Sequence, residues 1–369
     1  MTPRAVALCS LLGIRYPIIQ SGMSRVAGAE LVAEVSRAGG LGVLAALRLQ
    51  PDELRAEIRR IRTLTDRPFG VNLWLHPAVL SPLSPANVPD VDVSSVQQKL
   101  DEFRDRLGLA HTAARPAPFP DLVAQNLEVI LDERVPVWSI GLGSPTQEMV
   151  ARCRARGVRV MAMVGNVDDA RSVAKSGVDL IVAQGAEAGG HRSSWDGRHD
   201  ITGTMVLVPK IVDAVKPPVI AAGGIVDGRG LVAALALGAA GVMLGTRFIA
   251  VRESIAPPFF KDSVLAAGTG DTTVSHAFTG LPMRVLRNRF ADDYSSAPIL
   301  PPMLQSNAAE DIFKAAAQRG DREHFPMPAG ESAGLIGDMP AAADVVQAIV
   351  SEADAVLREF TGTPGRPSQ

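Results

Sequence analysis

The sequence predicts an α/β protein built on a (β/α)8 barrel of the TIM type. Eight short apolar segments alternate with amphipathic segments, which is the count and the spacing of such a barrel. Hydrophobic residues make up 47% of the chain and aromatic residues only 4%, so the core must consist of small aliphatic side chains. Such a core is typical of parallel strands that are covered on both faces. A doubly wound open sheet is the alternative, but it rarely needs eight parallel strands of such even spacing.

The alternation of the two patterns places each strand between amphipathic segments. The expected strands are 17–20, 41–45, 69–75, 135–140, 158–164, 180–184, 218–222 and 241–245. The expected helices are 29–38, 51–64, 122–132, 146–156, 168–176, 204–215 and 229–237. Glycines fall where several of these helices should end, as C-terminal caps do. They are Gly39 with Gly40, Gly157, Gly177 and Gly238.

Two stretches depart from this repeat. Residues 76–120 are rich in proline around one helix-like run, 96–107, and they follow the third strand. A long insertion at the C-terminal end of a barrel strand lies over the active-site face, so we expect a lid or a wall of the substrate pocket. The barrel should then comprise residues 1–75 and 121–270. Residues 271–369, with helices at 308–319 and 341–360 and a frayed end at 361–369, should form a helical region that completes the substrate site.

Composition excludes several classes of partner. The net charge of −2 provides no electrostatic basis for binding nucleic acid or an anionic membrane. The apolar runs are far shorter than the ~20 residues that span a bilayer, and the N-terminus shows no signal segment. Cys9 and Cys153 are too few for a disulfide framework and lack the spacing of metal ligands, so we expect no metal. We therefore expect a soluble cytoplasmic protein, with its oligomeric state, including a homo-oligomer, left open.

The loop after the sixth expected strand carries the strongest chemical signal. It combines the glycines Gly185, Gly189 and Gly190 with His191, whose imidazole ordinarily titrates near neutral pH. In a barrel the functional groups lie on the loops that follow the strands. We interpret His191 as the catalytic residue, which either abstracts a proton or hydrogen-bonds to a substrate anion. A structural or solvated histidine is the alternative.

Other strand ends indicate a ligand that carries a phosphate. The seventh and eighth strands end in Gly223-Gly224 and Gly245-Thr246, and loops at these positions commonly bind phosphate through backbone N–H groups. A tight structural turn is the alternative. Asn72 interrupts the apolar third strand, where it would bond either a heteroaromatic ligand or the neighbouring backbone.

Further groups at strand ends suit the same ligand. Ser21-Gly22-Met23 offers a flexible backbone and an apolar sulfur that could lie beneath a flat ring, and Gln184 offers an amide that can both donate and accept. Amides, glycines and a phosphate loop, without a metal cluster, suit flavin mononucleotide (FMN).

With these motifs the chain resembles the nitronate monooxygenase family. The supporting segments are 17–20 with Met23, 38–42, 67–73, 183–192, 221–229, 245–248 and, in the tail, 286–289. The resemblance covers about residues 10–250 and, more weakly, the tail. It implies an FMN-binding barrel, a small second domain formed by the insertion and the tail, and His191 as the catalytic base. It also implies oxidation of alkyl nitronates, such as propionate 3-nitronate, by O2 to a carbonyl compound and nitrite.

By the same resemblance the cofactor contacts fall on one set of residues. They are Ser21, Gly22, Met23, Asn72, Gln184, Gly189, Gly224, Met243, Leu244, Gly245 and Thr246, and Gly190 and Gly223 complete the predicted set. One position departs from the family pattern, because relatives carry a histidine at the end of the fourth strand where this chain has Gly141. An FMN-dependent NAD(P)H reductase, of the enoyl-acyl carrier protein or quinone type, therefore stays as the alternative. A flavin-binding protein without turnover and a non-flavin phosphate-binding barrel also stay open.

Overall fold

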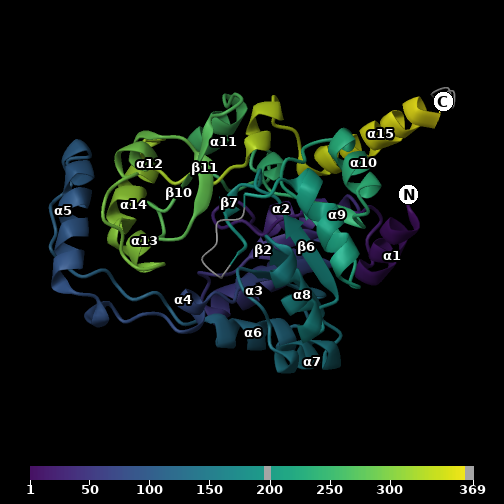
Figure 1. The fold of residues 1–369 in the computed structure, drawn as a ribbon, viewed down its shortest axis with the longest axis horizontal. Coiled ribbons are helices and arrows are strands. Elements are labelled where there is room, and N and C mark those ends of the chain that lie inside the picture. Colours follow the sequence, from purple (N-terminus) through teal and green to yellow (C-terminus); the bar gives the residue numbers. More distant parts are fainter. Residues whose placement is uncertain (195–200, 362–369) are drawn as a thin grey trace.

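The computed structural model describes residues 1–194 and 201–361, and it confirms the predicted barrel (Figure 1). Every predicted strand and helix of the barrel is present, with ends that agree to within two residues. The barrel strands are β1 (Ile18–Gln20), β2 (Gly42–Ala45), β3 (Phe69–Trp74), β4 (Val137–Gly141), β5 (Arg159–Val164), β6 (Leu180–Gln184), β8 (Val219–Ala222) and β9 (Gly241–Leu244). The helices between them are α2 (Ala29–Arg37), α3 (Pro51–Leu64), α6 (Val123–Asp132), α7 (Gln147–Ala155), α8 (Val167–Ser176), α9 (Thr204–Ala214) and α10 (Gly228–Ala236).

The eight strands are parallel and close into a ring. Their order is β1-β9-β8-β6-β5-β4-β3-β2. The ring closes between β1 and the start of β2, where Gln20 N donates to Leu41 O and Leu41 N donates to Ile18 O, both at 2.9 Å. Closure brings the C-terminal ends of all eight strands to one face, which is where barrel enzymes carry their sites.

Side chains at the helix N-termini fix where several of these helices begin. Thr146 accepts a hydrogen bond from Met149 N at the start of α7, and Asn166 accepts one from Asp169 N at the start of α8. Each cap satisfies a backbone N–H that has no partner within the helix. The amphipathic helices then bury their apolar faces against the strands.

The N-terminal residues form a helix that the sequence analysis did not assign. Helix α1 (Pro3–Leu12) begins at a Thr2 cap with proline in its first turn. Its Leu8, Cys9 and Leu12 are buried in one cluster with side chains from the barrel interior, such as Ile19. The helix thus closes the end of the barrel opposite the site.

The insertion and the tail pack together, although they lie far apart in the sequence. The insertion holds α4 (Pro77–Leu80), η1 (Pro85–Asn87) and α5 (Asp90–Arg106), which begins six residues before the helix-like run predicted at 96–107. After β9 come η2 (Thr246–Phe248), α11 (Pro258–Leu265), β10 (Thr272–Ser275), β11 (Met283–Leu286), α12 (Arg289–Asp293), α13 (Leu304–Ala308), α14 (Glu310–Arg319), η3 (Glu331–Leu335) and α15 (Ala342–Thr361). In Figure 1, α5 lies at the left edge beside α12, α13 and α14, and buried side chains of both parts form one hydrophobic cluster.

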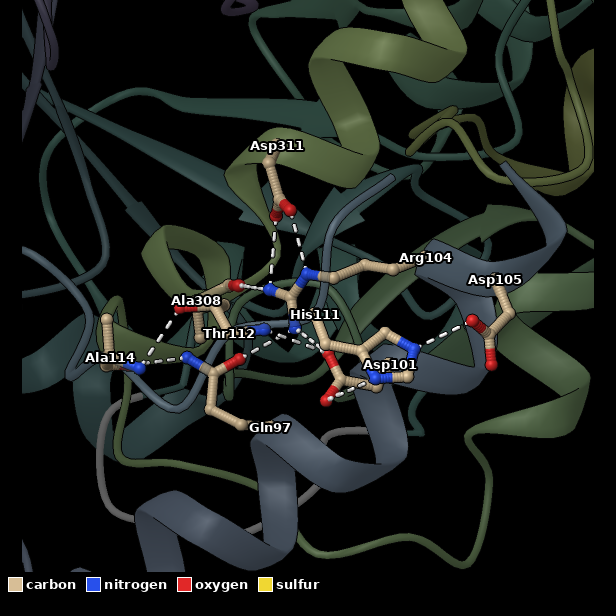
Figure 2. A network of polar contacts seen from close by, with 9 residues as sticks. All are labelled: Gln97, Asp101, Arg104, Asp105, His111, Thr112, Ala114, Ala308 and Asp311. Carbon is tan, nitrogen blue, oxygen red and sulfur yellow. Dashed lines mark hydrogen bonds and ion pairs between the residues drawn. The ribbon is translucent and has the colours of Figure 1, made fainter. Parts of the chain in front are cut away.

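One buried arginine fastens the insertion to the tail (Figure 2). Arg104 of α5 is 1% exposed and makes two hydrogen bonds to the carboxylate of Asp311 on α14, at 2.7 and 3.2 Å. The same guanidinium donates to Ala308 O at 2.9 Å, and within α5 to Gln97 and Asp101 at 2.9 and 2.8 Å. A planar guanidinium with five N–H donors suits such a junction.

The second region is mainly helical, as predicted, and the tail also forms a small sheet. Strands β10 and β11 pair antiparallel, and β11 pairs in turn with β7 (Gly190–His191), which is part of the loop after β6. These strands are only two to four residues long, so their sequences show too little alternation to be recognised.

The last helix takes a different position from the rest of the tail. Helix α15 packs on α10 and α2 of the barrel, and Glu352 accepts a hydrogen bond from Gly228 N. Residues 362–369, most of the end expected to fray, lie outside the described residues. Within the described part of the chain, no helix combines the length and the apolar character needed to span a bilayer.

We expect Arg104→Met to lower the free energy of unfolding by roughly 2–3 kcal/mol, because it leaves a buried amide and two carboxylates without their donor. Denaturant unfolding of the two proteins measures the difference. Arg106→Met is the matched control on the same helix. Its ion pair with Asp293 is more than one third exposed, so its effect should stay below about 1 kcal/mol. Equal effects of the two substitutions would contradict the proposed role of Arg104.

Candidate functional site

A cavity of about 910 Å³ lies at the C-terminal ends of the barrel strands. Small-molecule and cofactor sites are typically cavities of about 300–1,000 Å³, so this one can hold a large cofactor together with a substrate. All residues predicted for the site line it: Ser21, Gly22, Met23, Asn72, Gln184, Gly189, Gly190, His191, Gly223, Gly224, Met243, Leu244, Gly245 and Thr246. The fold therefore gathers them around one space, and their individual roles stay predictions.

His191 lies in the wall of this cavity with two side-chain neighbours. Its Nε2 is 2.9 Å from the Thr279 hydroxyl. Its ring meets the Trp74 indole edge-on, with 4.6 Å between ring centroids and 71° between the planes. Both contacts restrict the orientation of the imidazole, as a residue that acts on a bound ligand requires.

The electrostatic surroundings keep the His191 imidazole neutral. Burial, followed by the electrostatic influence of His76, Arg192 and Arg48, lowers its pKa to about 3. Protonation would place a charge where water is scarce and other positive groups are near. At neutral pH the ring therefore has one N–H donor and one lone pair.

The loop that carries His191 is held from inside by a buried arginine. The Arg192 guanidinium donates to three carbonyl oxygens of its own loop, those of Gly185, Ala186 and Ala188, at 3.0, 2.8 and 3.1 Å. Gln184 binds the other side of the loop. Its amide donates to His191 O at 3.0 Å and accepts from Ser193 N at 2.8 Å. The Gln184 amide thus forms hydrogen bonds to the backbone of the loop, an interaction that the sequence did not indicate.

The barrel and the tail also hold this loop. Glu187 anchors the loop by accepting hydrogen bonds from the backbone N–H and the hydroxyl of Thr204 at 2.9 Å. Arg284 of β11 donates to Ala186 O at 3.0 Å, and Met283 of the same strand pairs with His191. Thr279 and Arg284 fall in a stretch of the tail to which the sequence assigns neither a strand nor a site residue, so no local signal could have identified them.

The glycine at position 141 has a steric consequence. A Cβ atom at this position would lie 2.8 Å from Cδ1 and 3.0 Å from Nε1 of Trp74, closer than side chains approach. The absent side chain makes room for the Trp74 indole, which reaches His191. In this chain a tryptophan from β3 therefore occupies the space beside the end of β4.

Asn72 has a protein partner inside the barrel. Its amide nitrogen donates to the carbonyl and the hydroxyl of Ser139 on β4, at 3.2 and 3.1 Å. The predicted bond to neighbouring backbone is therefore present. The side chain also borders the cavity, so the predicted ligand contact stays a prediction.

The loops after β8 and β9 leave backbone facing the cavity. Gly223 and Gly224 have φ values of 104° and 74°, in the left-handed region that favours glycine. A Cβ atom at Gly223 would lie 3.1 Å from both Ala188 N and Thr204 Oγ1, so a side chain there would crowd the loop. Such uncovered backbone fits the phosphate group of FMN. Thr246 is one of the predicted ligand contacts. Its hydroxyl accepts a hydrogen bond from Gly330 N at 2.9 Å, which links this loop to the tail.

Methionine side chains form part of the cavity walls. Met23, Met163 and Met243 supply apolar sulfur side chains to its walls. Among the described residues no three histidine, cysteine or acidic side chains are placed to share a metal ion.

Comparisons with known proteins agree over nearly the whole chain. The family model for nitronate monooxygenase matches residues 6–352. A probable nitronate monooxygenase of Staphylococcus aureus (strain Newman) is 36% identical over 341 residues, which cover 90% of this chain and 93% of the relative. The structure of nitroalkane oxidase from Streptomyces ansochromogenes has a TM-score of 0.86 at 31% identity and covers 96% of this chain and 99% of that one.

A second solved structure matches the chain over nearly the same length. FabK from Thermotoga maritima has a TM-score of 0.75 at 32% identity and covers 97% of this chain and 99% of that one. The family model is described as nitronate monooxygenase, and the relative from Staphylococcus aureus is described as a probable nitronate monooxygenase. The chain therefore belongs to the nitronate monooxygenase family, a family of oxidoreductases.

Proposed function

We propose that the protein is an FMN-dependent enzyme that oxidises alkyl nitronates of the propionate 3-nitronate type with O2, giving a carbonyl compound and nitrite. The observation that carries the proposal is a neutral His191 in the wall of a cavity rimmed by backbone-exposing glycines. Membership of the nitronate monooxygenase family supports the same reaction. FMN, when bound, would accept electrons from the substrate and pass them to O2.

The chain's own residues would hold the cofactor by its two ends. The backbone of Gly223, Gly224 and the segment Gly245-Thr246 would receive the phosphate. The sulfur of Met23 and the amide of Asn72 would border the ring system. The amide of Gln184 would act indirectly, since it fixes the loop that presents His191.

The low pKa of His191 favours one of its two predicted roles. A group with a pKa of about 3 is a weak base in the free enzyme, so it is poorly suited to removing a proton from carbon. A nitronate is already an anion and needs no such proton transfer. The neutral imidazole can donate its N–H to that anion, and the negative charge would in turn raise the pKa of the ring. We therefore propose that His191 orients an anionic substrate.

A second candidate function follows from the likeness to FabK. The cavity is large enough for another ligand beside a cofactor, and Gly141 stands where the family resemblance implies a histidine. An NAD(P)H-dependent flavin reductase would use the same cofactor site but a different electron donor. Reduction of the bound flavin by each donor separates the two functions.

His191→Asn should keep its FMN and lose roughly 10²–10³-fold in turnover, because asparagine cannot place an N–H donor where the ring does. Nitrite release from propionate 3-nitronate measures turnover, and the absorbance of the purified protein measures bound flavin. Wild-type kcat in this variant would refute the assignment. A variant without flavin would instead show that His191 is needed for the structure of the site.

The pH dependence of kcat/KM should show no protonation of His191 between about pH 5 and 8. Because its pKa is lowered, the ring binds a proton only as the pH falls toward about 3. Nearly every His191 side chain is therefore neutral throughout the range from pH 5 to 8. The measurement uses preformed propionate 3-nitronate and corrects for the ionisation of the substrate. An inflection near pH 6.5 that disappears in His191→Asn would contradict the neutral imidazole.

Gly224→Val should weaken FMN binding roughly 10-fold or more, because a branched side chain disfavours the left-handed backbone that presents the N–H groups. Gly157→Val is a matched control. Gly157 has nearly the same φ, 73° against 74°, has open space around a Cβ atom, and lies at the end of α7 away from the cavity. Titration of the apoproteins with FMN measures both affinities. Equal losses in the two variants would assign the effect to backbone strain alone.

A further inference from the structure

Two arginines line the same cavity as His191, although neither was predicted to have a role in the site. Arg25 follows β1 and Arg48 follows β2, so both come from loops at the C-terminal face of the barrel. The Arg48 guanidinium lies 5.0 Å from the centre of the Phe119 ring and donates to Ser306 Oγ at 3.0 Å. The Arg25 guanidinium lies 5.8 Å from the centre of the Phe325 ring. Aromatic rings beside a guanidinium leave its N–H edge available for an oxyanion.

The charges of these arginines are not neutralised by close carboxylates. Within the described ranges neither guanidinium forms an ion pair, whereas Arg60, which also lines the cavity, pairs with Glu30. The acidic residue that acts on both arginines is Glu310, whose carboxylate is itself paired with Lys314 at 3.0 Å. The positive charge in this part of the cavity is thus left without a close counterion from the described chain.

The two arginines also lie close enough to repel one another. Burial lowers the pKa of both, and the charge of Arg25 lowers the pKa of Arg48 further. Both stay protonated at neutral pH, since an arginine in a protein keeps its charge. Two like charges in one cavity are costly unless a ligand of opposite charge joins them.

The backbone at Arg25 adds an independent observation. Its φ of 61° lies in the left-handed region, which a side chain such as arginine rarely adopts. Strain of this kind concentrates at ligand-binding sites, where the surrounding structure maintains it. The conformation belongs to the loop that leads from the predicted cofactor contacts Ser21 to Met23 into α2.

Arg48 connects this region to the proposed reaction site. Its charge contributes to the lowered pKa of His191, so the two groups act on one continuous space. One ligand could therefore place a charged end at the arginines while its reacting end lies at His191.

We propose that Arg25 and Arg48 form a specificity subsite for a second oxyanion, a carboxylate or a phosphate, on the molecule that reacts at His191. Guanidinium groups bind both oxyanions through paired N–H donors. The inference rests on the proposed function in one respect, namely that the reacting group is a nitronate. It defines the substrate class as nitronates that carry a negatively charged tail.

The test compares two nitronates of equal chain length on the flavin-loaded enzyme. Propionate 3-nitronate carries a carboxylate tail, and propyl 1-nitronate carries none. Arg25→Met and Arg48→Met should each lower kcat/KM for the carboxylated substrate roughly 10- to 100-fold, the loss expected for hydrogen bonds to a charged group. The value for propyl 1-nitronate should change less than about twofold.

The ratio of the two kcat/KM values is the decisive quantity, because a partly misfolded variant lowers both values equally. Arg48→Lys should recover part of the ratio, since it keeps the charge and loses the paired donors. Arg60→Met is the matched control: it lines the cavity but pairs with Glu30, so it should leave the ratio unchanged. An unchanged ratio in both Arg25→Met and Arg48→Met, without a change in coenzyme preference, would overturn the subsite.

A second arm separates the two sources of oxyanion. Anaerobic reduction of the flavin by NADPH and by NADH is measured in the same variants. A preference for NADPH that disappears in Arg25→Met and Arg48→Met would assign the subsite to a nucleotide phosphate rather than a carboxylate tail.

Binding without turnover distinguishes failure of the subsite from failure of the proposed function. Succinate places two carboxylates at a spacing similar to the two charged ends of propionate 3-nitronate, and calorimetric titration measures its affinity. If the wild-type protein oxidises neither nitronate but binds succinate in a way that requires both arginines, the subsite stands and the reaction falls. The opposite outcome is that nitronates are oxidised while the arginine variants keep the wild-type kcat/KM ratio of the two nitronates and the wild-type affinity for succinate. In that case the proposed reaction is supported and the subsite is refuted.

Discussion

The site depends on the way in which one loop is held. The loop after β6 carries His191, and the buried guanidinium of Arg192 draws its carbonyl groups inward. Pairing of β7 with β11 then fixes the backbone of His191 to the tail. A charged group with several hydrogen bonds is costly to separate from its acceptors, so the loop cannot easily adopt another conformation. The barrel therefore supplies the position of His191, while Thr279 of the tail and Trp74 of β3 orient its ring.

Gly141 and Trp74 share the space at the ends of β4 and β3, where the family resemblance implies a histidine. Gly141 leaves space that Trp74 fills, and the indole in turn packs against the imidazole. Burial in this wall favours the neutral form of His191, in agreement with its lowered pKa. The site thus combines an uncharged hydrogen-bonding group near the proposed reaction centre with positive charge from Arg25 and Arg48 elsewhere in the same cavity. This arrangement suits a substrate that is itself an anion.

The barrel could be predicted because its signals are local. Each strand is a short apolar run that alternates with amphipathic helices, and glycines such as Gly157 and Gly177 follow the helix ends with the left-handed backbone of C-terminal caps. The glycine-rich ends of β6, β8 and β9 follow from the same logic, since barrels place their ligands at these ends. His191 could be identified because it is the histidine that stands inside such a loop.

The remaining features depend on contacts between distant segments. Strands β10 and β11 are too short to show a period, and β7 exists only because the tail pairs with it. Thr279 and Arg284 reach the loop of His191 from the other end of the chain. Arg25 and Arg48 look like ordinary solvated charges in the sequence, and only the fold brings them into one cavity. Trp74 could not be connected with Gly141 until β3 and β4 were seen side by side.

The anaerobic absorbance spectrum of the purified protein, mixed separately with propionate 3-nitronate and with NADH or NADPH, tests the central claim most directly. We expect a yellow protein. The nitronate should reduce its flavin and so lower the flavin absorbance, whereas NADH and NADPH should leave the absorbance unchanged. Bleaching by NADH or NADPH alone would contradict the proposed reaction and assign the protein to the reductases. A colourless protein that takes up no FMN would contradict the cofactor itself.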